Sequence, residues 1–117
     1  MRDEPLQRGT TSEVRSRERE RIAPHLRGFQ VVALDSAGVQ RSSEELAFLL
    51  DRLETTPPQK TAFVIGGAVG LDPSIVSTAA ETLSLGPITL PHQLARVVLV
   101  EQLFRAMTIL RGHPYHN

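Results

Sequence analysis

Residues 61–76, which read TAFVIGGAVGLDPSIV, decide the fold class. Thr61–Ile65 is a short apolar run that contains β-branched residues and leads into glycines, a pattern that predicts a buried strand. Asp72 followed by Pro73 predicts the start of a helix, because aspartate caps the free amides of the first turn and proline suits the first helical position. A buried strand that turns through glycines into a helix is typical of an α/β protein.

The same alternation is predicted upstream of this stretch. Phe29–Leu34 is a second short apolar run and predicts another buried strand, with a turn expected over Asp35–Gly38. Ser42 stands three residues before Glu45, the spacing of a capping box, so a helix is expected to begin there and to end at Thr55–Pro58. The apolar residues of this helix recur at helical spacing and are Leu46, Leu49, Leu50 and Leu53.

Downstream, the helix that opens at Pro73 is expected to reach about Leu83. Ile88–Leu90 then predicts a third, very short strand, and His92–Leu110 predicts a long helix with Gly112 as its C-cap. The long helix is expected to carry one broad apolar face, formed by Leu94, Val97, Val98, Leu103, Phe104 and Met107. Because strands alternate with helices, the predicted fold is α/β with a mainly parallel sheet flanked by helices.

Composition and charge exclude several classes of protein. The 117 residues suit one domain, and 13 basic residues balance 13 acidic ones, so a strongly basic nucleic-acid binder is not indicated. The absence of cysteine removes disulfides, thiolate zinc sites and thiol nucleophiles. No apolar run approaches the about 18 residues that a membrane span needs, so no membrane association is expected.

Charges gather near the amino terminus, over Ser12–Arg21, where Glu and Arg alternate. Residues three and four positions apart on a helix can pair, so this segment predicts a solvent-exposed helix. Twelve of the 13 basic residues of the chain are arginine, which favours bidentate contacts to carboxylate or phosphate. An RNA contact through the arginines of this helix is the alternative interpretation.

Ligands of parallel α/β sheets bind where strands end and loops turn into helices. Three loops are therefore expected to converge, namely the loop after Leu34, the loop after Ile65, and Leu85–Leu90. The glycines of Gly66–Gly70 match neither the dinucleotide fingerprint nor the P-loop, and the negative charge of Asp72 disfavours a phosphate. The pattern favours a pocket for a cofactor with few or no phosphates, and ordinary strand-to-helix turns are the alternative.

The histidines do not predict a metal site. His113 and His116 have a spacing that would suit a metal on a helix, but Pro114 between them disfavours a helix there. His92, at the start of the long helix and next to the third loop, is either a capping and packing residue or a functional one.

Several strings in order resemble the SPOUT-class ribosomal RNA large subunit methyltransferase H (RlmH) family. They are FVIGGAVGL at 63–71 and LSLGPITLPHQLARVVLVEQLFRAMTILRGHPYHN at 83–117, with a strand into I-G-G, an L-P-H loop, a helix with R-V and E-Q, and a terminal H-P-Y-H. VVALDSAG at 31–38 is similar to the strand that precedes these elements in the family. The resemblance covers residues 12–117 and is carried by specific motifs rather than by composition.

The resemblance implies a SPOUT-type fold with a C-terminal trefoil knot that binds S-adenosylmethionine. It further implies a cytoplasmic homodimer that methylates N3 of a pseudouridine in 23S ribosomal RNA, without a metal. The positions that correspond to the family's methyl-donor contacts are Leu34, Gly66, Leu85, Gly86, Pro87, Ile88, Thr89 and Leu90. The candidates for substrate orientation and proton handling are His92, Arg96, Tyr115 and His116.

The chain departs from the family at its beginning. Family members carry a strand, a helix and a second strand before the charged segment, so residues 1–117 are expected to form a single SPOUT domain that lacks these elements. A non-catalytic knotted dimer that binds RNA or the ribosome is therefore the alternative function. The dimer is also expected because the apolar residues of the long helix, among them Val97, Val100 and Phe104, extend more than halfway around it.

Overall fold

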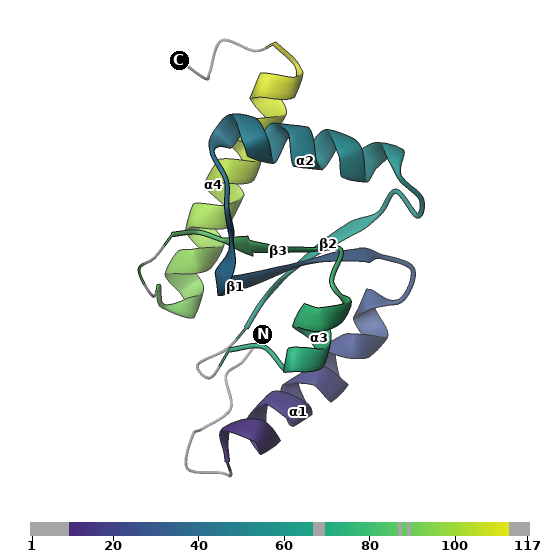
Figure 1. Cartoon of the computed structure of the whole chain (residues 1–117), viewed down its shortest axis with the longest axis vertical. Coiled ribbons are helices and arrows are strands. Elements are labelled where there is room, and N and C mark those ends of the chain that lie inside the picture. The colour runs from purple at the N-terminus through teal and green to yellow at the C-terminus, as the bar shows by residue number, and fades with distance from the viewer. Residues whose placement is uncertain (1–9, 67–69, 87, 89, 113–117) are drawn as a thin grey trace.

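A computed structural model of the chain describes residues 10–66, 70–86, 88 and 90–112 (Figure 1). Its centre is a three-stranded sheet in the order β2-β1-β3, in which both pairs of strands are parallel. Val32 of β1 lies opposite Phe63 in β2 and opposite Glu81 in β3. The strand bounds are Gln30–Gln40 for β1, Thr61–Ile65 for β2 and Glu81–Ser84 for β3. The predicted parallel α/β class is confirmed.

Helices cover both faces of this sheet, with α2 and α4 on one face and α1 and α3 on the other (Figure 1). Val32 and Leu34 of β1 pack in the core cluster with α2 and α4, whereas Ala33 packs in a second cluster with α3 and with residues at and just after the end of α1. A strand that is buried on both faces needs apolar residues at consecutive positions, as the sequence pattern indicated. The helices are α1 (Thr11–Ile22), the 3₁₀ helix η2 (Ala23–Leu26), α2 (Ser43–Thr55), α3 (Pro73–Thr78) and α4 (His92–Leu110).

The amino-terminal end of α2 is fixed by the predicted capping box. The Ser42 hydroxyl accepts a hydrogen bond from the Glu45 amide at 3.1 Å, and the Glu45 carboxylate accepts one from the Ser42 amide at 2.7 Å. The leucines that follow are turned toward the sheet, since Leu46, Leu49 and Leu53 are buried. The helix ends at Thr55, before the two prolines.

Replacing Ser42 with alanine is expected to lower the free energy of unfolding by about 1 kcal/mol, because one amide of the first turn loses its partner. Urea denaturation followed by circular dichroism measures this change. Ser12→Ala is the control, since Ser12 is exposed on α1 and surface changes of this kind stay within about 0.5 kcal/mol. Equal stability of the two variants would contradict the capping role of Ser42.

The third strand lies elsewhere than predicted. Helix α3 ends at Thr78 instead of continuing to Leu83, and Glu81–Ser84 forms β3. The Ala80 amide donates to the Val31 carbonyl at 2.8 Å, so pairing with β1 overrides the helical propensity of this alanine-containing segment. The predicted strand Ile88–Leu90 is wrong at its described positions: Ile88 is 75% exposed and lies in a bend, while Thr89 is outside the described residues.

The predicted turn over Asp35–Gly38 is also wrong, because β1 continues through it. Leu34 and Val39 both have Leu83 as their partner in β3, so the intervening residues form an irregularity of the β-bulge type. A Cβ built at Gly38 would lie 2.7 Å from the backbone carbon of Thr82. Only glycine allows β1 to approach β3 this closely, and the strand therefore extends past the sequence signal for a turn.

Helix α4 has the predicted bounds, but its apolar residues do not form one face. The side toward the core buries Ala95, Leu99, Ala106 and Thr108, and the partly buried Leu103 and Ile109 pack against the same core. Larger apolar residues point outward and remain exposed, namely Leu94, Val97, Val100, Phe104, Met107 and Leu110. We refer to these six exposed residues as the outer stripe of α4. The C-cap is Arg111 and not the predicted Gly112, which follows it with a φ of +65°.

Within the described residues, no helix combines the length and the apolar character that crossing a bilayer demands.

Candidate functional site

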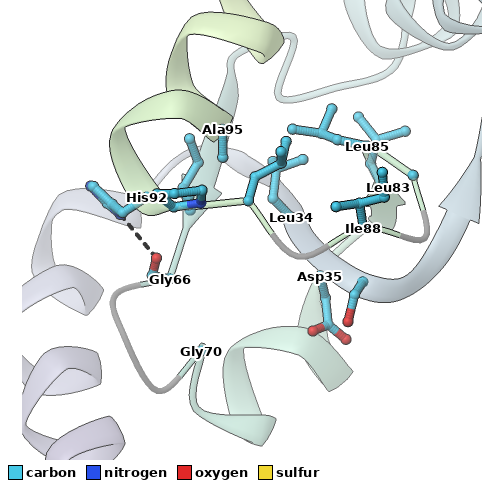
Figure 2. A pocket seen from close by; sticks show the side chains of 14 residues that line it. Leu34, Asp35, Gly66, Gly70, Leu83, Leu85, Ile88, His92 and Ala95 are labelled. Atoms are coloured by element: carbon cyan, nitrogen blue, oxygen red, sulfur yellow. Dashed lines mark hydrogen bonds between the residues drawn. The ribbon is translucent and has the colours of Figure 1, made fainter. Parts of the chain in front are cut away.

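A cavity of about 580 Å³ lies at the carboxyl ends of the three parallel strands (Figure 2). Its wall is built by the irregular part of β1 that begins at Leu34, by the ends of β2 and β3 with the segments after them, and by the first turn of α4. The lining residues are Leu34, Asp35, Ser36, Ile65, Gly66, Gly70, Leu83, Leu85, Gly86, Ile88, Leu90, Pro91, His92 and Ala95. The three segments that were expected to converge do meet at this cavity, although the first of them is the irregular part of β1 and not a loop. This position matches the place where parallel α/β sheets bind their ligands.

Most of this wall is apolar. Leu34 ends the regular part of β1 and Leu83 is buried in β3, so both are held by the sheet itself. Leu85 and Ile88 follow β3 and lie on the same side of the cavity in Figure 2. Aliphatic side chains on fixed strands and loops form a suitable slot for a flat heteroaromatic ring.

His92 joins the start of α4 to the end of β2. Its ring nitrogen Nδ1 lies 2.9 Å from the carbonyl oxygen of Gly66, the contact drawn as a dashed line in Figure 2. A carbonyl oxygen only accepts, so Nδ1 carries the hydrogen and donates it. In the neutral ring, Nε2 then has the free lone pair and can accept a proton from a ligand.

Glycines let the loops after β2 and β3 fold tightly. A Cβ built at Gly66 would lie 2.7 Å from the carbonyl carbon of Gly70 and 2.7 Å from the Leu71 nitrogen, closer than real Cβ contacts. After β3, the Ser84 hydroxyl accepts a hydrogen bond from the Gly86 amide at 3.1 Å and donates one to the Gly86 carbonyl at 3.0 Å. Gly86 has a φ of +134°, which favours glycine.

Charged groups are few along the described part of this cavity. Asp35 and Ser36 come from the irregular part of β1, and His92 is the other titratable residue of the lining. A Cβ built at Gly70 would lie 3.5 Å from Nη2 of Arg15, so a guanidinium from α1 stands beside the cavity wall. The cavity therefore combines apolar walls with one carboxylate, one hydroxyl and one imidazole.

Asp72 stands outside the lining and has a structural role. Its carboxylate accepts from the Ser74 amide at 2.9 Å and from the Ser74 hydroxyl at 2.6 Å, so it caps α3 as predicted. These two hydrogen bonds, with the hydroxyl contributing most, lower the pKa of Asp72, and the nearby guanidinium of Arg19 acts in the same direction.

The residues predicted for the site fall into three groups. Seven line the cavity: Leu34, Gly66, Leu85, Gly86, Ile88, Leu90 and His92. Arg96 is exposed on α4 and does not line it. The remaining four, which are Pro87, Thr89, Tyr115 and His116, lie outside the described residues.

Sequence reasoning missed several lining residues. Asp35 and Ser36 were assigned to a turn, although their position directly after Leu34 was a usable signal. Leu83 was assigned to a helix, so its place at the cavity depends on β3. Pro91 and Ala95 flank His92 at the start of α4, where helical spacing places residue 95 one turn after 91.

Comparison with known proteins gives one family. The sequence model of the family described as "Predicted SPOUT methyltransferase" matches residues 2–116. Among curated proteins, the chain is 52% identical over 100 residues to ribosomal RNA large subunit methyltransferase H of a Caulobacter species, covering 86% of this chain and 65% of the relative. Proteins with the same name from Bacillus cereus and Listeria welshimeri are 54% and 53% identical over 87 residues, covering 74% of this chain and 55% of each relative. The chain therefore spans between about half and two thirds of the length of these relatives. The family resemblance that the motifs indicated is confirmed.

Proposed function

Since the chain belongs to the SPOUT methyltransferase family, we propose that it is an S-adenosylmethionine-dependent methyltransferase that acts on ribosomal RNA of the large subunit. One observation carries the proposal. The six expected donor-contact residues that the structure describes, which are Leu34, Gly66, Leu85, Gly86, Ile88 and Leu90, all line a single cavity. They come from β1, from the segment after β2 and from the segment after β3, so their convergence follows from the fold and not from their spacing in the sequence.

The dimensions and chemistry of this cavity fit the donor. Its volume of about 580 Å³ lies within the range of small-molecule sites. Leu34, Leu83 and Leu85 would hold the adenine ring, and the backbone at Gly86 would meet the polar edge of the ring. When bound, S-adenosylmethionine supplies a methyl group that its sulfonium makes electrophilic. The glycines near the cavity carry no side chain, so the ligand can approach their backbone closely.

His92 is proposed to accept the proton that leaves the target nitrogen. Its Nδ1 donates to the Gly66 carbonyl, which holds the ring in place and leaves Nε2 as the proton acceptor. The target proposed from the family resemblance is N3 of a pseudouridine in 23S ribosomal RNA. Arg96, Tyr115 and His116 are proposed to orient this nucleotide, with Arg96 exposed on α4 where it can meet RNA.

The family resemblance also supports a C-terminal trefoil knot as the finer description of the fold. In this proposal the segment between β3 and α4 is threaded, and the loops that crowd the cavity are the walls of the knot. The close approach of residue 66 to residues 70 and 71 and the contact of His92 with Gly66 are consistent with such a compact end of the sheet.

A homodimer acting in the cytoplasm completes the proposal. The outer stripe of α4 leaves large apolar side chains in water, with Val97 63% and Phe104 54% exposed. Val97, Val100, Phe104 and Met107 follow one another at helical spacing, so they form one continuous surface. Apolar surface of this kind on a helix marks an interface, and a second copy of the same chain is the commonest partner.

Isothermal titration calorimetry is expected to give a dissociation constant in the micromolar range for S-adenosylmethionine, as is common for metabolite sites. Transfer of a radioactive methyl group to large ribosomal subunits then tests the activity. Subunits that already carry the modification are the control, since they should accept no label. Donor binding that is absent while ribosome association persists would contradict the enzyme and favour the non-catalytic RNA-binding dimer.

A further inference from the structure

Asp35 is the one carboxylate among the described residues of the cavity wall. It follows Leu34 directly, is partly buried, and forms no hydrogen bond or ion pair with the described part of the chain. Figure 2 shows it on the side of the cavity that also carries Leu85 and Ile88, away from His92. A cationic group of a ligand bound in this cavity would therefore meet a carboxylate that has no competing ion pair among the described residues.

We propose that Asp35 makes the site prefer the positively charged methyl donor over the neutral product of the reaction. This inference rests on the proposed donor site. S-adenosylmethionine carries a sulfonium that S-adenosylhomocysteine lacks. On transfer, the bond between methyl carbon and sulfur breaks with its electron pair on sulfur, a bond to the RNA nitrogen forms, and the proton of that nitrogen passes to a base. The ligand thus loses one positive charge in the step.

The surroundings of Asp35 make its charge effective. Leu34 precedes it in β1, Leu85 and Ile88 line the same cavity, and apolar walls reduce the screening of charges inside it. The donor is proposed to fill this one cavity, and Asp35 is the one carboxylate on the described part of its wall, so the sulfonium lies within reach of its charge. The guanidinium of Arg15 beside Gly70 adds positive charge nearby, which repels a cationic ligand and offsets part of the attraction to Asp35.

The test compares three ligands on the full chain and on Asp35→Asn by calorimetry. The ligands are S-adenosylmethionine, S-adenosylhomocysteine, and sinefungin, which carries an ammonium where the donor has its sulfonium. Asp35→Asn is expected to weaken the two cationic ligands about tenfold, or about 1.4 kcal/mol, and the neutral thioether less than about twofold. Ser36→Ala removes a neighbouring polar group of the same wall without changing the charge. It should leave the ratios between the dissociation constants of the three ligands unchanged.

A second measurement needs no variant. Raising the ionic strength from about 0.05 to 0.5 M should weaken the binding of both cationic ligands to the unaltered chain and leave S-adenosylhomocysteine nearly unchanged, because salt screens the attraction. Equal losses for all three ligands in Asp35→Asn, or no loss, would overturn the role of Asp35 while the donor site stands. Failure of the unaltered chain to bind any of the three would instead overturn the donor site, and this inference with it.

Discussion

Replacing Gly66 with valine is expected to abolish binding of S-adenosylmethionine, with the dissociation constant raised more than about a hundredfold. The first side-chain carbon would lie 2.7 Å from two backbone atoms of residues 70 and 71, and no flexible side chain can move to relieve the contact. The loop must open, which shifts the Gly66 carbonyl away from Nδ1 of His92 and distorts the cavity wall. Calorimetry with the donor measures the loss.

Gly28→Ala is the matched control for this experiment. Gly28 has a φ of +83°, so a side chain strains it, but a Cβ there meets no atom within 4 Å, and Gly28 does not line the cavity. The control is expected to lose about 1 kcal/mol of stability and to keep donor binding. Circular dichroism verifies that each variant is folded at the temperature of the titration. Unchanged binding in folded Gly66→Val would remove the assignment of this cavity to the donor.

Replacing Phe104 with glutamate is expected to convert a dimer into a monomer. Phe104 lies in the middle of the outer stripe of α4 and is 54% exposed, so the change leaves the core of the subunit intact. In an interface, the same carboxylate would be buried against apolar side chains of the second copy, a cost of several kcal/mol. Light scattering on the eluate of a size-exclusion column measures the molecular mass of each variant at micromolar concentrations.

Phe29→Glu provides the control for the dimer experiment. Phe29 is also a partly exposed aromatic residue, at 42%, but it precedes β1 and lies outside the outer stripe. This variant is expected to keep the mass of the unaltered protein. An unaltered protein that is monomeric throughout the micromolar range, or a Phe104→Glu variant that stays dimeric, would remove the outer stripe as the interface.

The two halves of the proposed site differ in how far the sequence predicts them. Gly66 directly follows β2, Gly86 lies in the segment after β3, and His92 begins α4. Neighbouring residues in the sequence determine each of these positions. Leu83 and Asp35 reach the cavity only because β3 pairs with β1 along its irregular extension. Their contribution therefore depends on contacts between segments that lie nearly fifty residues apart.

Local interactions account for the features that the residues alone predict correctly. The capping box of Ser42 and Glu45, the aspartate cap of α3, the bounds of β2 and the extent of α4 all depend on residues within one turn or one short run, and all are confirmed. Contacts between distant segments make Glu81–Ser84 a strand and set which side of α4 faces inward. Both outcomes depend on free energies of pairing and packing between distant segments, which the local pattern does not contain.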